Sequence, residues 1–170
     1  MGRPAAPAVT LRRDLPDAAA TAAAGHALGA LLGPGDAVAL IGDLGAGKTS
    51  LVQAIAAGAG VPADVAVTSP TFTLVQEYAG GAVPLVHADL YRIERARELD
   101  EIGLDDRLRD GDAAVLVEWA DRFAQVLPAD HLRIELRHAG DGRVLEARGG
   151  GPRSDALATA WAAALATDAA

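Results

Sequence analysis

Hydrophobic and polar residues along the chain follow two patterns. Short apolar runs are typical of buried strands, whereas apolar residues spaced three or four positions apart are typical of helices. The runs at 37–41 and 113–117 are the clearest strands. By the same patterns we predict further strands at 8–11, 73–78, 82–89, 131–137 and 143–147, and helices at 15–32, 50–57, 91–109, 120–127 and 154–167.

Glycine-rich turns indicate how neighbouring strands pair. Gly80-Gly81 separates the predicted strands 73–78 and 82–89, and Ala139-Gly140-Asp141-Gly142 separates the last two strands. Each turn predicts an antiparallel hairpin. Strands that alternate with helices are typical of a parallel sheet. We therefore expect an α/β fold whose central sheet is mixed.

Glycine and proline also mark the ends of the predicted helices. Pro16 suits the first turn of helix 15–32, and Gly33-Pro34-Gly35 ends that helix. Gly103 divides segment 91–109 into two pieces. The run Gly149-Gly150-Gly151-Pro152 predicts a flexible break before the final helix.

A glycine-rich loop lies between strand 37–41 and helix 50–57. Its sequence is Gly42-Asp43-Leu44-Gly45-Ala46-Gly47-Lys48-Thr49, which fits the phosphate-binding pattern G-x-x-x-x-G-K-[ST] at every fixed position. Strand, loop and helix form the context that the pattern requires, because loop amides and the helix N-terminus bind the phosphates together. We therefore predict that residues Asp43 to Ser50 bind a nucleotide.

The residue types of the loop suit this chemistry. Glycines at 42, 45 and 47 permit backbone angles that a Cβ would forbid, Lys48 offers a compact charge for the β and γ phosphates, and the Thr49 hydroxyl is a hard ligand for Mg²⁺. A chance match in a glycine-rich chain is the alternative. Lys48 weighs against chance, because it is the only lysine in a chain with 14 arginines.

Two acidic residues at the ends of predicted strands are candidates for the carboxylates of a nucleotide site. Asp89 ends strand 82–89, and Glu118 follows the more apolar run 113–117. Either could hold Mg²⁺, and the other could orient the attacking water. Ordinary capping or ion-pairing is the alternative for each acid. Segment 68–72, Thr-Ser-Pro-Thr-Phe, is equally consistent with a nucleotide-sensing switch and with a plain turn.

Composition narrows the possible functions. The 170 residues suit a single domain, within which we expect 1–9 and 166–170 to be flexible. The chain has no cysteine, which excludes disulfides and thiolate metal sites. We find no signal peptide and no apolar stretch long enough to span a membrane, so we expect a cytoplasmic protein. A net charge of −8 disfavours a broad nucleic-acid surface. Any contact with nucleic acid is then expected through a partner.

Four segments together resemble one family. Besides the loop, they are Thr68-Ser69-Pro70-Thr71-Phe72-Thr73-Leu74, His87-Ala88-Asp89-Leu90-Tyr91-Arg92 and Val117-Glu118-Trp119. In order and spacing they resemble the TsaE (YjeE) family of small bacterial P-loop ATPases, which takes part in making threonylcarbamoyladenosine on tRNA. The likeness covers roughly residues 10–150, and it implies a three-layer P-loop NTPase fold.

The resemblance also implies roles for individual residues. ATP and Mg²⁺ would be the cofactors, with Thr49 and Asp89 coordinating the metal, Glu118 essential for turnover and Trp119 beside the nucleotide. Thr71 would lie in the switch near the γ-phosphate. Slow ATP hydrolysis would reset a complex with the threonylcarbamoyl transferase TsaD and its scaffold TsaB. One departure is Ala120, where family members often have proline.

Two other functions are consistent with the loop alone. A small-molecule kinase would need an arginine-rich lid, for which segment 91–109 is the only candidate, and its many acids argue against that role. A nucleotide-gated binding module would use ATP only to order segment 68–71. A GTPase is disfavoured, because no second lysine is available for an N-K-x-D guanine motif.

Overall fold

The computed structural model describes residues 10–70 and 72–168. Its centre is a seven-stranded sheet in the order β1-β7-β6-β2-β5-β4-β3. Strands β6, β2, β5 and β4 run parallel, whereas β7, β1 and β3 are antiparallel to their neighbours. The strands are β1 (Leu11–Leu15), β2 (Ala37–Ile41), β3 (Val75–Tyr78), β4 (Leu85–Asp89), β5 (Ala114–Glu118), β6 (Leu132–Ala139) and β7 (Gly142–Gly149). The predicted mixed sheet and both predicted hairpins are confirmed.

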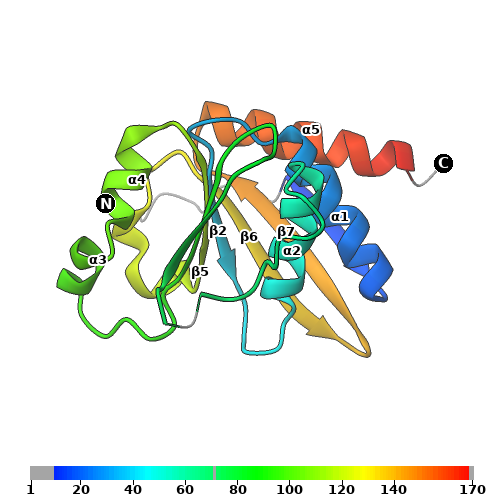
Figure 1. The fold of residues 1–170 in the computed structure, drawn as a ribbon. Helices are drawn as coiled ribbons and strands as arrows, with labels where there is room; N and C mark the ends of the chain where they lie inside the picture. Colours follow the sequence, from blue (N-terminus) through cyan, green and yellow to red (C-terminus); the bar gives the residue numbers. More distant parts are fainter. Residues whose placement is uncertain (1–9, 71, 169–170) are drawn as a thin grey trace, which may run out of the picture.

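Helices cover the two faces of the sheet and make a three-layer molecule (Figure 1). One face packs against α1 (Ala18–Leu31), α2 (Lys48–Gly58) and α5 (Pro152–Asp168), and the other against α3 (Arg97–Glu101), α4 (Leu104–Asp110) and the 3-10 helix η1 (Ala120–Val126). The molecule has two hydrophobic cores, one on each face of the sheet, and alternate residues of the central strands pack into one core or the other. Val38 and Leu40 of β2 belong to the first core, and Ala39 and Ile41 belong to the second.

The N-terminal boundaries differ from the prediction. The first strand is Leu11–Leu15, not 8–11, and residues 8 and 9 lie outside the described residues. Leu11 and Leu15 are buried, and their strand pairs with β7 along its whole length. Asp17 then caps α1 by accepting from Ala20 N at 2.8 Å, so Pro16 precedes the helix and does not form its first turn.

Segment 91–109 is less helical than predicted. Only α3 and α4 are helices, and Gly103 separates them with a φ of 74° in the left-handed region, which confirms the predicted break. Residues 91–96 precede α3 and contain no helix. The predicted helix 120–127 is the 3-10 helix η1, with a kink at Phe123.

The two helices nearest the glycine-rich loop approach each other unusually closely. A Cβ on Gly29 of α1 would lie 2.0 Å from the Ile55 carbonyl oxygen of α2, and one on Gly58 of α2 would lie 2.0 Å from the His26 carbonyl oxygen. Small residues therefore let the two backbones touch. This contact explains why α1 is so rich in alanine and glycine.

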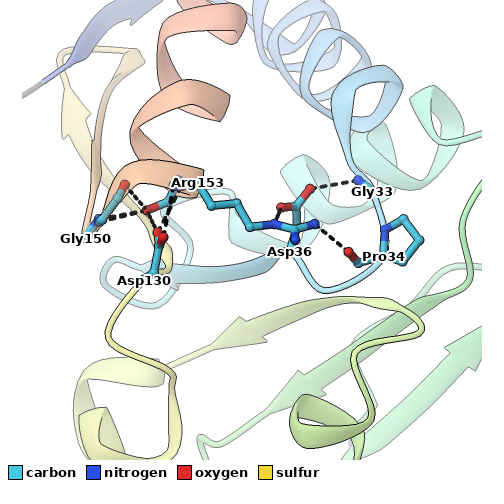
Figure 2. Close-up of polar contacts among 8 residues, drawn as sticks. Gly33, Pro34, Asp36, Asp130, Gly150 and Arg153 are labelled. Atoms are coloured by element: carbon cyan, nitrogen blue, oxygen red, sulfur yellow. Dashed lines mark hydrogen bonds and ion pairs between the residues drawn. The ribbon is translucent and has the colours of Figure 1, made fainter.

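The glycine run before α5 is not a flexible break. Figure 2 shows Asp130, from the loop before β6, at the start of α5, where its carboxylate accepts from Ser154 N at 2.9 Å and Arg153 N at 3.0 Å. A Cβ on Gly150 would lie 2.2 Å from the Ala129 carbonyl oxygen. The glycines are needed because the chain packs tightly here, which contradicts the predicted flexibility.

The same cluster extends to the loop between α1 and β2. The Arg153 guanidinium donates to Asp36 Oδ1 at 2.6 Å and to the Pro34 carbonyl at 2.5 Å, and Asp36 Oδ2 accepts from Gly33 N at 2.7 Å (Figure 2). Asp36 precedes β2, whereas the phosphate-binding motif follows β2. The cluster therefore lies at the opposite edge of the sheet from the candidate site.

None of the helices within residues 10–70 and 72–168 is both long enough and apolar enough to cross a bilayer.

Candidate functional site

The glycine-rich loop joins the end of β2 to the first residue of α2. Gly45 and Gly47 have φ values of 80° and 103°, in the left-handed region that favours glycine. Gly42 is needed for a different reason than predicted, because a Cβ there would lie 2.6 Å from the Leu136 carbonyl oxygen. Two glycines thus shape the loop, and the third lets β6 lie against it.

Lys48, the first residue of α2, is buried. Its ammonium donates to the carbonyls of Gly42 at 2.5 Å and Asp43 at 3.0 Å, and Nζ lies 4.1 Å from the centroid of the Trp119 ring. Burial lowers the pKa of Lys48 below its ordinary value, and nearby acids, Glu118 first among them, oppose that shift. The lysine therefore lies between an aromatic ring, two carbonyls and several carboxylates.

The two candidate acids lie side by side. Asp89 and Glu118 are Cα partners at the carboxyl ends of the parallel strands β4 and β5. Glu118 is buried, and its Oε1 accepts from the Thr49 hydroxyl at 3.3 Å. Asp89 accepts from the Ser69 hydroxyl at 2.6 Å and from Tyr91 N at 2.9 Å. The fold thus brings together Thr49, Asp89 and Glu118, which are 29 to 69 positions apart in the sequence.

The donor set suits Mg²⁺. Thr49, Asp89 and Glu118 offer hydroxyl and carboxylate oxygens, which are the hard ligands that this ion prefers. In the part of the chain that the structure describes, no group of three or more His, Cys, Asp or Glu residues could hold a metal by itself. Mg²⁺ is commonly bound by one or two carboxylates together with substrate phosphates, and binding of Mg²⁺ by these residues stays a prediction.

A cavity of about 480 Å³ opens above the loop. It is lined by most of the predicted residues, namely Leu44, Gly45, Gly47, Lys48, Thr49, Ser50, Asp89, Glu118 and Trp119. Asp43 and Ala46 do not line it. The Asp43 carbonyl instead accepts from Lys48 and from Ala46 N.

The candidate switch segment borders this cavity. Ser69 and Pro70 line it, and Thr71, a predicted nucleotide contact, lies outside the described residues. Phe72 is 91% exposed, and Leu74 has a φ of 62°, a strained value for a branched residue. The segment's switching role stays a prediction.

Trp119 follows Glu118 with a backbone φ of 58°, again in the left-handed region. Its ring also lies 5.0 Å, centroid to centroid, from that of Tyr91. Ala120 is buried as the first residue of η1. The Trp119 ring therefore contacts both Lys48 and Tyr91.

Several residues of the site were missed from the sequence. Tyr91 and Arg92 line the cavity. Arg143, at the start of β7, donates to the loop carbonyls of Ala46 at 3.0 Å and Gly45 at 3.1 Å. His87 is fully buried and lies 2.7 Å from Glu118. Only His87 carried a local signal, since a polar residue inside an apolar strand needs a partner.

These residues occur in a chain that matches known proteins. A family model described as "Threonylcarbamoyl adenosine biosynthesis protein TsaE" matches residues 15–145. The chain belongs to the TsaE family. The family model thus confirms the resemblance seen in the four sequence segments.

Relatives in other bacteria share the TsaE description. The protein is similar to the "tRNA threonylcarbamoyladenosine biosynthesis protein TsaE" of Bacillus subtilis, at 44% identity over 64% of this chain and 65% of that protein. It is 37% identical to the Nostoc protein of the same name, over 75% of this chain and 78% of the relative. The Streptomyces coelicolor TsaE protein is 40% identical, over 68% of this chain and 77% of its own length.

A solved structure supports the fold. The crystal structure of Bacillus subtilis YdiB matches with a TM-score of 0.75 at 33% sequence identity, and the match covers 90% of this chain and 94% of YdiB. The α/β architecture with a P-loop is therefore that of the TsaE family, and the predicted fold class is confirmed.

Proposed function

We propose that this protein is the ATP-binding and slowly ATP-hydrolysing subunit of the machinery that makes threonylcarbamoyladenosine on tRNA. Membership of the TsaE family supports the pathway. The observation that carries the ATPase assignment is the convergence of Lys48, Thr49 and Glu118 on one cavity beside the glycine-rich loop. Lysine, hydroxyl and carboxylate at such a loop are the parts that phosphoryl transfer to water requires.

Each group has a separate role in this proposal. Loop amides and Lys48 bind the β and γ phosphates, and Ser50 and Trp119 border the nucleotide. Thr49 and Asp89 would hold Mg²⁺, and Glu118, which contacts Thr49 and pairs with Asp89 across the strands, would be a third ligand. Mg²⁺ held there would supply positive charge to offset the negative charge that develops during phosphoryl transfer.

Glu118 orients the attacking water. Its carboxylate is fixed at both oxygens, by Thr49 on Oε1 and by His87 on Oε2, so it can accept a hydrogen bond from water in a constant direction. Lys48 lies near enough to stabilise this buried negative charge.

A kinase is the less favoured alternative. Segment 91–109 is the one candidate lid in the sequence, and two of its arginines are engaged in ion pairs away from the loop. Arg107 contacts Glu77, Asp110 and Asp112, and Arg109 contacts Asp105 and Asp106. This pairing argues against Arg107 and Arg109 as residues of a phosphate lid, whereas Arg92 of the same segment lines the cavity.

In the proposed complex, TsaD transfers the threonylcarbamoyl group, TsaB acts as a scaffold, and ATP hydrolysis by this protein resets the complex between rounds. The net charge of −8 favours indirect contact with tRNA. We expect a protein with that role to be cytoplasmic. We also propose that residues 1–170 form a single ATPase domain.

Steady-state ATP turnover tests the proposal. We expect slow Mg²⁺-dependent release of phosphate by the protein alone, and a faster rate when TsaD and TsaB are added. Glu118→Ala should lower kcat about 100-fold or more, as is usual for loss of a group that handles the water proton. Thr49→Ala should mainly weaken Mg²⁺-nucleotide binding, and Glu101→Ala, an exposed acid on α3, serves as the control.

Three results would contradict the proposal. A turnover rate that does not respond to TsaD and TsaB argues against the regulatory subunit. Phosphate that ends on a small hydroxyl acceptor indicates a kinase, and nucleotide binding without any release indicates a nucleotide-gated module.

A further inference from the structure

His87 is a polar residue in the middle of the buried strand β4. Its side chain has no exposed surface, and its Nε2 lies 2.7 Å from Glu118 Oε2. Among residues 10–70 and 72–168, its other ring nitrogen, Nδ1, has no hydrogen-bond partner. A core histidine that serves only packing would be easily replaced by an apolar residue of similar size, because burying an unpaired nitrogen costs free energy.

The sheet directs His87 and Glu118 toward the same layer. His87 is the Cα partner of Leu116, and Glu118 is the Cα partner of Leu40. Leu116 and Leu40 both belong to the core beneath α1 and α2. Because paired residues of adjacent strands lie on one face, His87 lies below Glu118 on the side of the sheet that carries Thr49.

The hydrogen bonds favour one form of the imidazole ring. A proton on Nε2 lets the ring donate to the Glu118 carboxylate, which accepts. A proton on Nδ1 would be a buried donor without an acceptor, because that nitrogen has no hydrogen-bond partner among the described residues. The ring thus donates through Nε2 to one oxygen of Glu118.

We propose that His87 is a positioning residue for Glu118. By occupying Oε2, it fixes the plane of the carboxylate and leaves Oε1 as the oxygen that faces Thr49 and the cavity. His87 thereby determines the direction in which Glu118 can accept a hydrogen bond from water. His87 lies on β4, the strand that also carries the metal-binding candidate Asp89. This inference rests on the proposed ATP hydrolysis.

Two substitutions of His87 test its hydrogen bond to Glu118, and the rate of partner-stimulated ATP hydrolysis is measured for each. His87→Leu fills the space without a donor, and it should lower kcat on the order of 100-fold, the loss typical of a misplaced catalytic group, while KM for ATP changes less than threefold. His87→Gln offers an amide N–H at a similar reach and should restore kcat to within tenfold of wild type. In a Glu118→Ala background, His87→Leu should have no further effect on kcat.

A buried residue on the other face of β4 provides the matched control. Val86→Ala should destabilise the strand, since Val86 is fully buried in the second core, but leave kcat per folded molecule unchanged. If Val86→Ala and His87→Leu lower kcat equally, His87 is merely structural and the proposal is wrong.

Imidazole ¹⁵N shifts give a readout that does not depend on turnover. We expect the His87 ring to show a protonated Nε2 and an unprotonated Nδ1. The signals of His87 are identified as those that disappear in His87→Gln. The opposite tautomer would overturn the inference.

If the wild-type protein with its partners releases no phosphate, the ATPase proposal fails first, and the role of His87 in hydrolysis falls with it. Normal turnover by His87→Leu would refute only the role of His87.

Discussion

At the scale of single residues, the most constrained group in the site is Lys48. Its ammonium is fixed between two loop carbonyls and the face of Trp119, in a buried position that lowers its pKa. A guanidinium is planar and wider, and it cannot occupy the same point between three groups. This geometry explains why a chain with 14 arginines has its single lysine at this position.

The prediction that follows is that Lys48→Arg keeps the charge but loses the function. We expect nucleotide affinity to fall at least about tenfold, nearly as far as in Lys48→Ala, because the guanidinium displaces Trp119 or the loop. Isothermal titration with Mg²⁺ and a non-hydrolysable ATP analogue measures this change. Arg109→Lys, an exchange in exposed ion pairs of α4, should leave the affinity unchanged. Wild-type affinity in Lys48→Arg would show that charge alone suffices.

The loop could be predicted from sequence because its chemistry is local. Eight consecutive residues define it, and their types have physical reasons that do not depend on the rest of the chain. Arg143 could not be predicted, because it reaches the loop carbonyls from 97 positions away. The pairing of His87 with Glu118 likewise required the register of β4 and β5. The sequence alone did not rank Asp89 against Glu118, and the fold places both at the same edge.

At the scale of elements, the contact between α1 and α2 supports the helix that begins at Lys48. It depends on glycines, because any Cβ on Gly29 would lie within 2.0 Å of a backbone oxygen of α2. Alanine is the better helix former by about 1 kcal/mol, so local propensity alone predicts that Gly29→Ala stabilises the protein. The clash with a backbone atom opposes this gain, and only separation of the helices relieves it.

We therefore predict that Gly29→Ala destabilises the protein by about 1–3 kcal/mol, the usual cost of overpacking. Urea unfolding followed by circular dichroism measures the free energy of unfolding. Ala30→Gly, at an exposed position of the same helix, should cost about 1 kcal/mol from propensity alone and serves as the reference. A stabilised Gly29→Ala variant would mean that the two helices can move apart without loss.

Most elements could be predicted because their signals were strong, but some ends could not. The apolar runs of β2 and β5 and the glycine turns of the hairpins located the sheet. The start of β1 was misplaced because Leu11 and Leu15 are buried by pairing with β7, more than 120 positions later in the chain. Glycines 149–151 were misread because the sequence does not distinguish a glycine that gives flexibility from one that gives close packing.

At the scale of the whole molecule, two polar clusters lie at opposite edges of the sheet. One is the candidate site at the carboxyl ends of the parallel strands. The other, around Asp130, Arg153 and Asp36, joins three distant segments of the chain at the start of β2, β6 and α5 (Figure 2). Because the second cluster lies far from the loop, its loss should change stability without changing the intrinsic activity.

Asp130 makes this stability depend on pH. The Ser154 hydroxyl above all, and then the amides at the start of α5, lower the pKa of Asp130 below its ordinary value. A carboxylate whose pKa is lowered by folding stabilises the folded state above its unfolded pKa, which is about 4. That contribution is lost as the pH falls from about 4 through the folded pKa.

We predict that Asp130→Asn lowers the free energy of unfolding by about 1 kcal/mol at pH 7, the usual value of a helix cap. The difference from wild type should shrink as the pH falls below about 4, because the wild-type carboxyl then becomes protonated and loses the same bonds. Urea unfolding at several pH values measures both effects, with Asp64→Asn in an exposed turn as the control. A difference that stayed constant down to pH 3 would show that Asp130 acts through its shape and not through its charge.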